Sequence, residues 1–223
     1  MEKEISHIKE IFEILKDELK ENKLPSASKS NWNGVIDTPF TTLISCILSL
    51  RTKDEVTDKA SMQLLKKHNS PEKILKLSDK KIKSLIYPVG FYKTKSKRIK
   101  EISKTLINNY NGNVPDNLEE LLKLKGVGRK TANIVMLYGH KKQGFLPIDT
   151  HCHRIPNRLG WIKTKTPEQT EKELKKILPK RYWDDFNHLF VKFGQKICVP
   201  ISPFCSKCPI KKYCKQISVD KNR

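Results

Sequence analysis

Four cysteines near one end of the chain constrain its fold more than any other feature of the sequence. Cys198, Cys205, Cys208 and Cys214 form the pattern C-x6-C-x2-C-x5-C. Because a reducing cytosol disfavours disulfides, four thiols in so short a segment favour a metal site with four sulfur ligands. Zinc sites usually combine two C-x2-C pairs and this segment has one. The uneven spacing therefore favours a [4Fe–4S] cluster, with zinc as the alternative.

The charge balance points to a polyanionic partner. The chain has 223 residues, with 45 Lys and Arg against 24 Asp and Glu, and its formal net charge is +21. Nucleic acid is the obvious polyanion, and a lysine-rich solvated surface with no such partner is the alternative. Lys207, Lys211 and Lys212 lie within the cysteine pattern. A metal-bound loop carrying these lysines would present a rigid cationic surface to phosphates, or would simply balance the charge of the thiolates.

Composition and hydrophobic spacing predict an all-α protein. The hydrophobic fraction of 37%, with Gly 9 and Pro 12, excludes a disordered tail and a fibrous chain. No stretch approaches the roughly 20 apolar residues of a membrane span, and no secretory signal is found. We therefore expect a monomeric, cytoplasmic protein of a prokaryote, associated with the nucleoid and not with a membrane. Apolar residues recur at helical spacing, whereas alternating strands and short hairpin turns between apolar runs are not found.

Local signals predict where several helices begin and end. Thr38, Ser70 and Ser78 have the positions of N-cap residues, and Asp116 is expected to open a short helix. The helix over residues 38–50 is apolar nearly all round and is therefore expected to be central. Further helices are expected from Ile5 to near Leu24 and over residues 94–109, 167–178 and 182–193, with a polar linker at residues 26–33.

A glycine-rich turn lies between two of the helical patterns. Gly126, Val127 and Gly128 are followed by Arg129 and Lys130. Two glycines one residue apart permit a positive φ and a tight turn. The turn presents backbone N–H groups at the start of the next helix, and such groups bind phosphate. The segment therefore predicts a helix-hairpin-helix that grips a nucleic-acid backbone without reading the bases.

Two titratable residues in this part of the chain have structural as well as catalytic interpretations. Lys130 is either one more surface lysine or a nucleophile. Asp149 stands at the start of another expected helix, where it is either an N-cap or a catalytic carboxylate. The residues alone leave both alternatives open.

Three segments, in this order along the chain, resemble the endonuclease III family. They are residues 124–135, residues 148–155 and the cysteine pattern, with weaker similarity at residues 48–54 and 89–93. The resemblance implies a DNA glycosylase that excises oxidised pyrimidines from duplex DNA and nicks the abasic site. It also implies two α-helical domains with a DNA-binding cleft between them. A helical barrel with the hairpin would span residues 34–143, and a cluster-bearing domain would combine residues 1–33 with residues 144–223.

The resemblance assigns roles to particular residues. Lys130 matches the family's nucleophile, Asp149 matches its catalytic carboxylate, and the four cysteines match its cluster ligands. The loops around Arg51 and Phe91 match the places where the family inserts side chains into DNA. Lys125 replaces a proline that usually precedes the hairpin, so it either loosens the turn or adds a phosphate contact. Arg51 stands where many relatives have glutamine.

A mechanism follows from these roles. A stacked nucleotide must be flipped out of the duplex before its sugar carbon can be attacked. Arg51 and Phe91 would hold the gap open, and the alternative for Phe91 is ordinary packing beside Pro88. The uncharged amine of Lys130 would attack C1′ and form a Schiff base, with Asp149 accepting a proton. β-Elimination would then break the strand.

Two rival functions have to be weighed against this mechanism. One is a non-catalytic DNA-binding protein, and the other is a monofunctional glycosylase that removes mismatched bases. Lys130 argues against both, because a glycosylase that uses only water needs no lysine there. His151 is expected to contact DNA or support the site, with a core histidine as the alternative.

Overall fold

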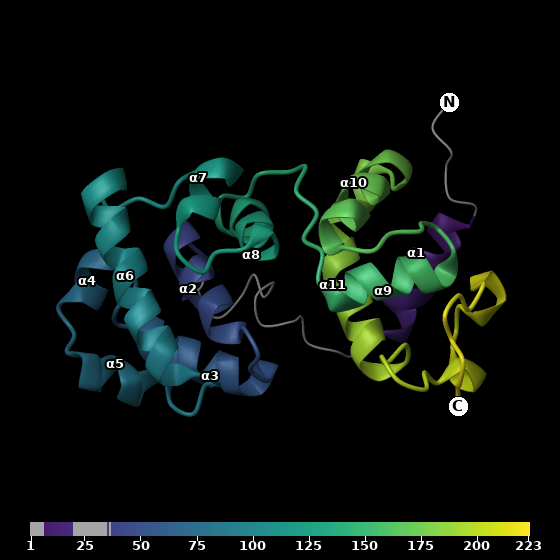
Figure 1. Cartoon of the computed structure of the whole chain (residues 1–223), viewed down its shortest axis with the longest axis horizontal. Coiled ribbons are helices and arrows are strands. Elements are labelled where there is room, and N and C mark those ends of the chain that lie inside the picture. The colour runs from purple at the N-terminus through teal and green to yellow at the C-terminus, as the bar shows by residue number, and fades with distance from the viewer. Residues whose placement is uncertain (1–6, 20–34, 36) are drawn as a thin grey trace. The chain divides into compact units, whose positions relative to one another are not determined.

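The computed structural model describes residues 7–19, 35 and 37–223, and these residues form helices and loops without a strand. The prediction of an all-α fold is therefore confirmed. The described helices divide into two compact units between Phe145 and Leu146 (Figure 1). The first unit ends at Phe145, and the second unit combines the helix at residues 8–18 with residues 146–223. None of the described helices is both long and apolar enough to cross a membrane.

The helices of the unit that ends at Phe145 surround one central helix. They are α2 (Pro39–Ser49), α3 (Asp54–Leu65), α4 (Pro71–Leu75), α5 (Asp79–Ile86), α6 (Tyr92–Tyr110), α7 (Leu118–Lys123) and α8 (Arg129–Ile134), which continues as the π-helical turn η2 (Val135–Gly139). Helix α2 is buried along nearly its whole length and packs against α3, α6, α8 and η2. Its central position confirms the prediction for residues 38–50, because only a helix surrounded by others can bury apolar residues on every face.

Helix starts in this unit follow the predicted N-caps. Thr38 forms a capping box with Thr41, in which each hydroxyl accepts a hydrogen bond from the other residue's backbone N–H. The hydroxyls of Ser70 and Ser78 each accept from the N–H group three residues along. The cap of α7 is Asn117, whose Oδ1 accepts from Glu120 at 2.9 Å, so the expectation that Asp116 opens this helix is wrong by one residue.

The physical reason for that error lies far along the chain. The carboxylate of Asp116 pairs instead with the ammonium of Lys142 at 2.8 Å. Aspartate and asparagine cap helices about equally well, so a distant lysine decides between two adjacent candidates. The predicted helices over residues 94–109, 167–178 and 182–193 agree with the structure to within three residues at each end. The first helix ends at Glu18, earlier than the predicted end near Leu24, which lies outside the described residues. The predicted linker at residues 26–33 lies outside the described residues.

The second unit packs around an aromatic core. Its elements are α1 (Ile8–Glu18), α9 (Thr150–Leu159), α10 (Pro167–Ile177), η3 (Lys180–Tyr182), α11 (Trp183–Lys196), η4 (Cys205–Lys207) and η5 (Lys211–Tyr213). Helix α11 packs against α9 and α1, and α10 packs against α9. Phe12, Phe186 and Phe190 are buried between them, and the rings of Phe186 and Phe190 stack with centroids 4.2 Å apart. This core fixes the position of α9, which begins immediately after Asp149.

Candidate functional site

The turn between α7 and α8 has the geometry of a hairpin that exposes its backbone. Gly126 has a φ of +82°, which a side chain would strain. Gly128 is extended, with a φ of −92°, and serves as the N-cap of α8. A Cβ atom placed on Gly128 would meet nothing within 4 Å. The second glycine is therefore not required by a left-handed conformation, and it leaves open space beside the first amides of α8, where a phosphate could approach.

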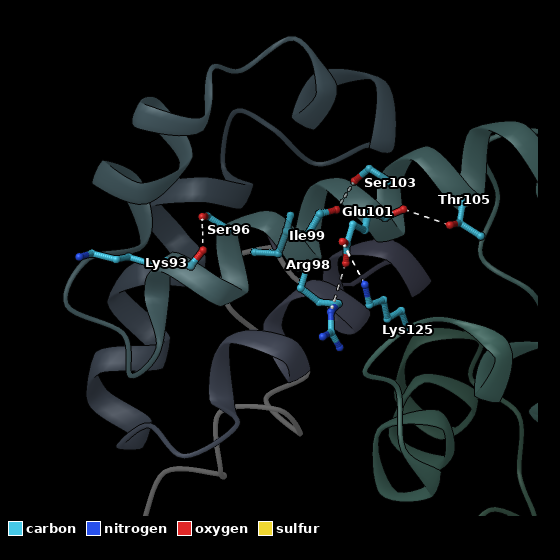
Figure 2. Close-up of polar contacts among 8 residues, drawn as sticks. All are labelled: Lys93, Ser96, Arg98, Ile99, Glu101, Ser103, Thr105 and Lys125. Atoms are coloured by element: carbon cyan, nitrogen blue, oxygen red, sulfur yellow. Dashed lines mark hydrogen bonds and ion pairs between the residues drawn. The ribbon is translucent and has the colours of Figure 1, made fainter.

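Side chains of α6 brace this hairpin. The guanidinium of Arg98 covers Gly126, so a Cβ atom on that glycine would overlap it. Figure 2 shows the side chains of Arg98 and Lys125 converging on Glu101. The Nε of Arg98 lies 3.5 Å from Oε2 of Glu101, and the Nζ of Lys125 lies 3.2 Å from Oε1. Lys125, predicted to contact DNA, thus lies in an ion pair that ties the hairpin to α6. Its side chain remains largely exposed, and a DNA contact at this residue stays a prediction.

Lys130 is the second residue of α8 and is half-buried. Its positive charge acts on the thiol of Cys46 on α2 and lowers the pKa of that thiol. Burial of Cys46 has the larger effect and raises the pKa to about 12. The buried thiol is therefore protonated at neutral pH. Hairpin geometry thus places the predicted nucleophile close to the central helix of its unit.

Asp149 is the N-cap of α9, which is the structural role predicted for it as an alternative to catalysis. Its Oδ1 accepts hydrogen bonds from the backbone N–H groups of His151 and Cys152, both at 2.8 Å. The ring of His151 lies against Gly194 of α11, where a Cβ atom would overlap it, and its Nδ1 is 3.0 Å from Arg154. His151 is therefore packed on the second unit's own helices, and its DNA contact stays a prediction.

All four cysteines of the pattern line one cavity in the second unit. They are free thiols and are partly buried. Burial raises the pKa of the Cys208 thiol to about 11, so a bound metal centre is needed to hold it as a thiolate at neutral pH. Arg158 is buried beside them and donates to the sulfur of Cys198 at 3.4 Å. The shared cavity, the partly buried thiols and the neighbouring arginine are features expected of cysteines that bind a metal centre.

The surroundings of these thiols suit a multi-iron cluster. The backbone N–H of Gln216 donates to the sulfur of Cys214 at 3.4 Å, and N–H donors of this kind stabilise cluster sulfurs. Across the described ranges, no three His, Cys, Asp or Glu side chains converge closely enough to hold a single metal ion. A four-iron cluster holds its ligands further apart than one ion does, and four cysteines that line one cavity are compatible with such a group.

Three lysines lie on the short turns that carry the cysteines. Lys207 belongs to η4, whereas Lys211 and Lys212 belong to η5, and all three are exposed. The ammonium of Lys212 lies 4.8 Å from the centroid of the Tyr213 ring. The structure thus places these cations on the surface of the cysteine segment, as the sequence predicts.

The two loops predicted to enter DNA come together in the first unit. The guanidinium of Arg51 lies 5.9 Å from the centroid of the Phe91 ring. Phe91 is 63% exposed, so the alternative in which it packs as an ordinary core residue beside Pro88 is wrong. An exposed phenylalanine beside an arginine is a suitable pair to fill a gap in a duplex.

Comparison with known proteins identifies the family. Residues 44–180 match the HhH-GPD superfamily of base excision DNA repair proteins. Endonuclease III from Thermotoga maritima is 52% identical over 176 residues, which cover 79% of this chain and 82% of that protein. The chain belongs to the endonuclease III family.

Solved structures of the endonuclease III family have the same fold. A non-covalent endonuclease III–DNA complex matches with a TM-score of 0.80 and 30% identity, covering 94% of each chain. A trapped endonuclease III–DNA covalent intermediate matches with a TM-score of 0.77 and 31% identity, covering 93% of this chain and 95% of the other. Both similarities extend over the two compact units.

The predicted site residues of this endonuclease III family member are divided between its two units. The hairpin, Lys130 and the two exposed loops lie in the first unit, whereas Asp149 and the cysteines lie in the second. Sequence reasoning missed Arg98, which covers Gly126 of the hairpin. It also missed Lys95 and Arg158, which bond to groups far away along the chain. No local pattern marks them among the 45 Lys and Arg residues.

Proposed function

We propose that this chain is a bifunctional DNA glycosylase and abasic-site lyase of base excision repair. Its substrate is duplex DNA with an oxidised pyrimidine. The observation that carries the proposal is the hairpin, in which a backbone open at Gly128 is followed within two residues by the half-buried amine of Lys130. The hairpin holds the DNA backbone, so the lysine next to it is positioned to meet a sugar of the same strand.

The reaction uses the amine of Lys130 as nucleophile. The amine attacks C1′ of the extruded nucleotide, the bond from C1′ to the damaged base breaks, and the proton lost by nitrogen passes to Asp149. The C1′–O4′ bond of the sugar then breaks, O4′ takes up the proton held by Asp149, and C1′ becomes double-bonded to nitrogen as a Schiff base. The Schiff base acidifies a C2′ proton, and loss of that proton expels the 3′ phosphate. Asp149 also stabilises the positive charge that develops on the sugar as the base departs. The two compact units are, in this proposal, the two domains that contact the duplex.

The second part of the proposal is a [4Fe–4S] cluster held by Cys198, Cys205, Cys208 and Cys214. Members of the family generally carry such a cluster. When bound, it supplies four metal–sulfur bonds that hold the two short turns of this segment in place. Arg158 donates to the Cys198 sulfur and to the carbonyls of Val199 and Pro200, and so orients the first ligand. The segment then offers Lys207, Lys211 and Lys212 to DNA phosphates.

A panel of duplexes tests the substrate class. Each duplex carries one lesion: an oxidised pyrimidine, uracil, 8-oxoguanine or a G·T mismatch. We expect the oxidised pyrimidine to be excised at least about tenfold faster than the others, with strand cleavage accompanying base release. Single-turnover rates of base release and of nicking are measured separately. Base release without nicking would instead support the monofunctional alternative.

Metal analysis tests the cluster. We expect protein purified without oxygen to contain about four iron and four sulfide per chain and to absorb broadly near 400 nm. Cys208→Ser should lose most of the iron, because a ligand is removed from the set. Cys46→Ala is the matched control, since Cys46 is buried on α2 in the other unit, and it should keep its iron. Stoichiometric zinc without iron would contradict the proposal.

A further inference from the structure

Two neighbouring loops of the first unit expose an unusual amount of apolar surface. One loop covers residues 50–53, between α2 and α3, and the other covers residues 87–91, between α5 and α6. Leu50 is 44% exposed, Tyr87 is 62% exposed and Phe91 is 63% exposed. Large side chains gathered in this way mark a surface that binds something. Tyr87 and Leu50 were not singled out from the sequence.

A hydrogen bond and a close backbone approach hold the two loops together. The N–H of Gly90 donates to the hydroxyl of Thr52 at 3.1 Å. A Cβ atom on Gly90 would lie 2.6 Å from the carbonyl oxygen of Arg51, so only glycine permits this approach. Arg51 and Phe91 both have a left-handed backbone, with φ of +54° and +58°. Such conformations cost free energy in residues with side chains, so the surrounding contacts must maintain them.

One buried ammonium group supplies those contacts. Lys95, in the first turn of α6, is 6% exposed. Its Nζ donates to the carbonyls of Leu48 at 2.8 Å and Leu50 at 2.5 Å, and to the hydroxyl of Thr52 at 3.0 Å. An ammonium has three protons, so all three find an acceptor. The carbonyls belong to the C-terminal end of α2, where a positive charge is favourable.

The same ammonium therefore connects the two loops. It fixes the end of α2 from which Arg51 projects, and it fixes the Thr52 hydroxyl that in turn holds Gly90, the residue before Phe91. Because Lys95 is only 6% exposed, its charge is withdrawn from water, and this burial lowers its pKa to about 8. Burying an ammonium group costs free energy. A buried lysine at this place is therefore best explained if the positions of the two carbonyls are needed for function.

We propose that Lys95 is a positioning residue that sets these two loops as one preformed wedge. Tyr87 and Leu50 enter the duplex with Arg51 and Phe91 when the nucleotide is extruded. This inference rests on the function proposed above. A preformed wedge does not have to be ordered during binding, so the entropic cost of base flipping is lowered. The wedge fills the gap left by an extruded nucleotide, so it should affect cleavage of a duplex but not of a single strand.

The test compares the same lyase step on two substrates. One is an abasic site in a duplex and the other is the same abasic site in a single-stranded oligonucleotide. In Lys95→Met we expect duplex cleavage to fall by about tenfold to a hundredfold, whereas single-strand cleavage changes by less than about twofold. Fluorescence of 2-aminopurine beside the lesion should show the same loss of base extrusion. Lys104→Met, an exposed lysine on the same helix, is the charge-matched control and should resemble the wild type.

A second variant guards against misfolding of the first. Thr52→Val keeps the shape of the side chain but removes the hydroxyl that joins Lys95 to Gly90, and we expect the same duplex-specific loss. Thr52→Ser should restore duplex cleavage. Equal losses on both substrates, or no loss in either variant, would overturn the positioning role of Lys95. A wild-type protein that cleaves neither substrate would overturn the proposed function instead.

Discussion

Replacing Lys130 with glutamine should abolish the covalent adduct that borohydride traps between this protein and abasic-site DNA. Strand cleavage should fall by at least about a thousandfold. The reason is that a Schiff base requires an amine, and glutamine has a polar side chain of similar length without one. Trapped adduct is measured on a denaturing gel after single-turnover reaction with a labelled duplex.

Lys125→Gln is the matched control for this experiment. It removes a lysine from the same hairpin, but one that pairs with Glu101 and not one assigned to chemistry. Its adduct should form at nearly the wild-type yield, with a modest loss of affinity and a shallower dependence of binding on salt. Adduct formation by Lys130→Gln at the wild-type yield would transfer the nucleophile's role to another amine.

Replacing Asp149 with asparagine should separate its chemical role from its structural one. Asparagine retains an oxygen that accepts from the N–H groups of His151 and Cys152, and it caps helices as well as aspartate does. We therefore expect an unchanged melting temperature, together with a fall of about 10²–10⁴ in the rate of base excision, because the carboxylate is lost. Circular dichroism and single-turnover excision measure the two effects independently.

Asp149→Ala should lose the cap as well as the charge. A missing N-cap costs about 1 kcal/mol, which in a chain of this size lowers the melting temperature by about 2–4 °C. Its excision rate should match that of Asp149→Asn. Wild-type excision by Asp149→Asn would remove the carboxylate from the mechanism and leave Asp149 as a helix cap alone.

Features that depend on a few consecutive residues could be predicted from the sequence. The caps at Thr38, Ser70 and Ser78 each act over three residues, so their residue types identify them. The hairpin was predicted for the same reason, although only Gly126 needs its left-handed conformation. The cysteine pattern is local too, and its four members do line one cavity.

Features that depend on distant partners could not be predicted. Asp116 was expected to open α7, but its carboxylate pairs with Lys142, and the neighbouring Asn117 caps the helix. Lys95 reaches acceptors more than forty residues earlier in the chain, and its acceptors are backbone carbonyls that any residue would provide. Arg158 likewise binds a sulfur and two carbonyls on a segment that follows it by about forty residues. Burial of a cation is decided by packing, which hydrophobic spacing does not encode.

Because Asp149 is both a helix cap and the proposed catalytic carboxylate, a mutation at this codon would have an unusual effect in a cell. One side chain starts α9 and is assigned the chemistry, and an amide satisfies the first requirement but not the second. A gene carrying that exchange would yield a folded protein that still binds lesions but excises them about 10²–10⁴ times more slowly. Such a product would shelter damage from every other enzyme able to remove it, so we expect the mutation to harm a cell more than deletion of the gene.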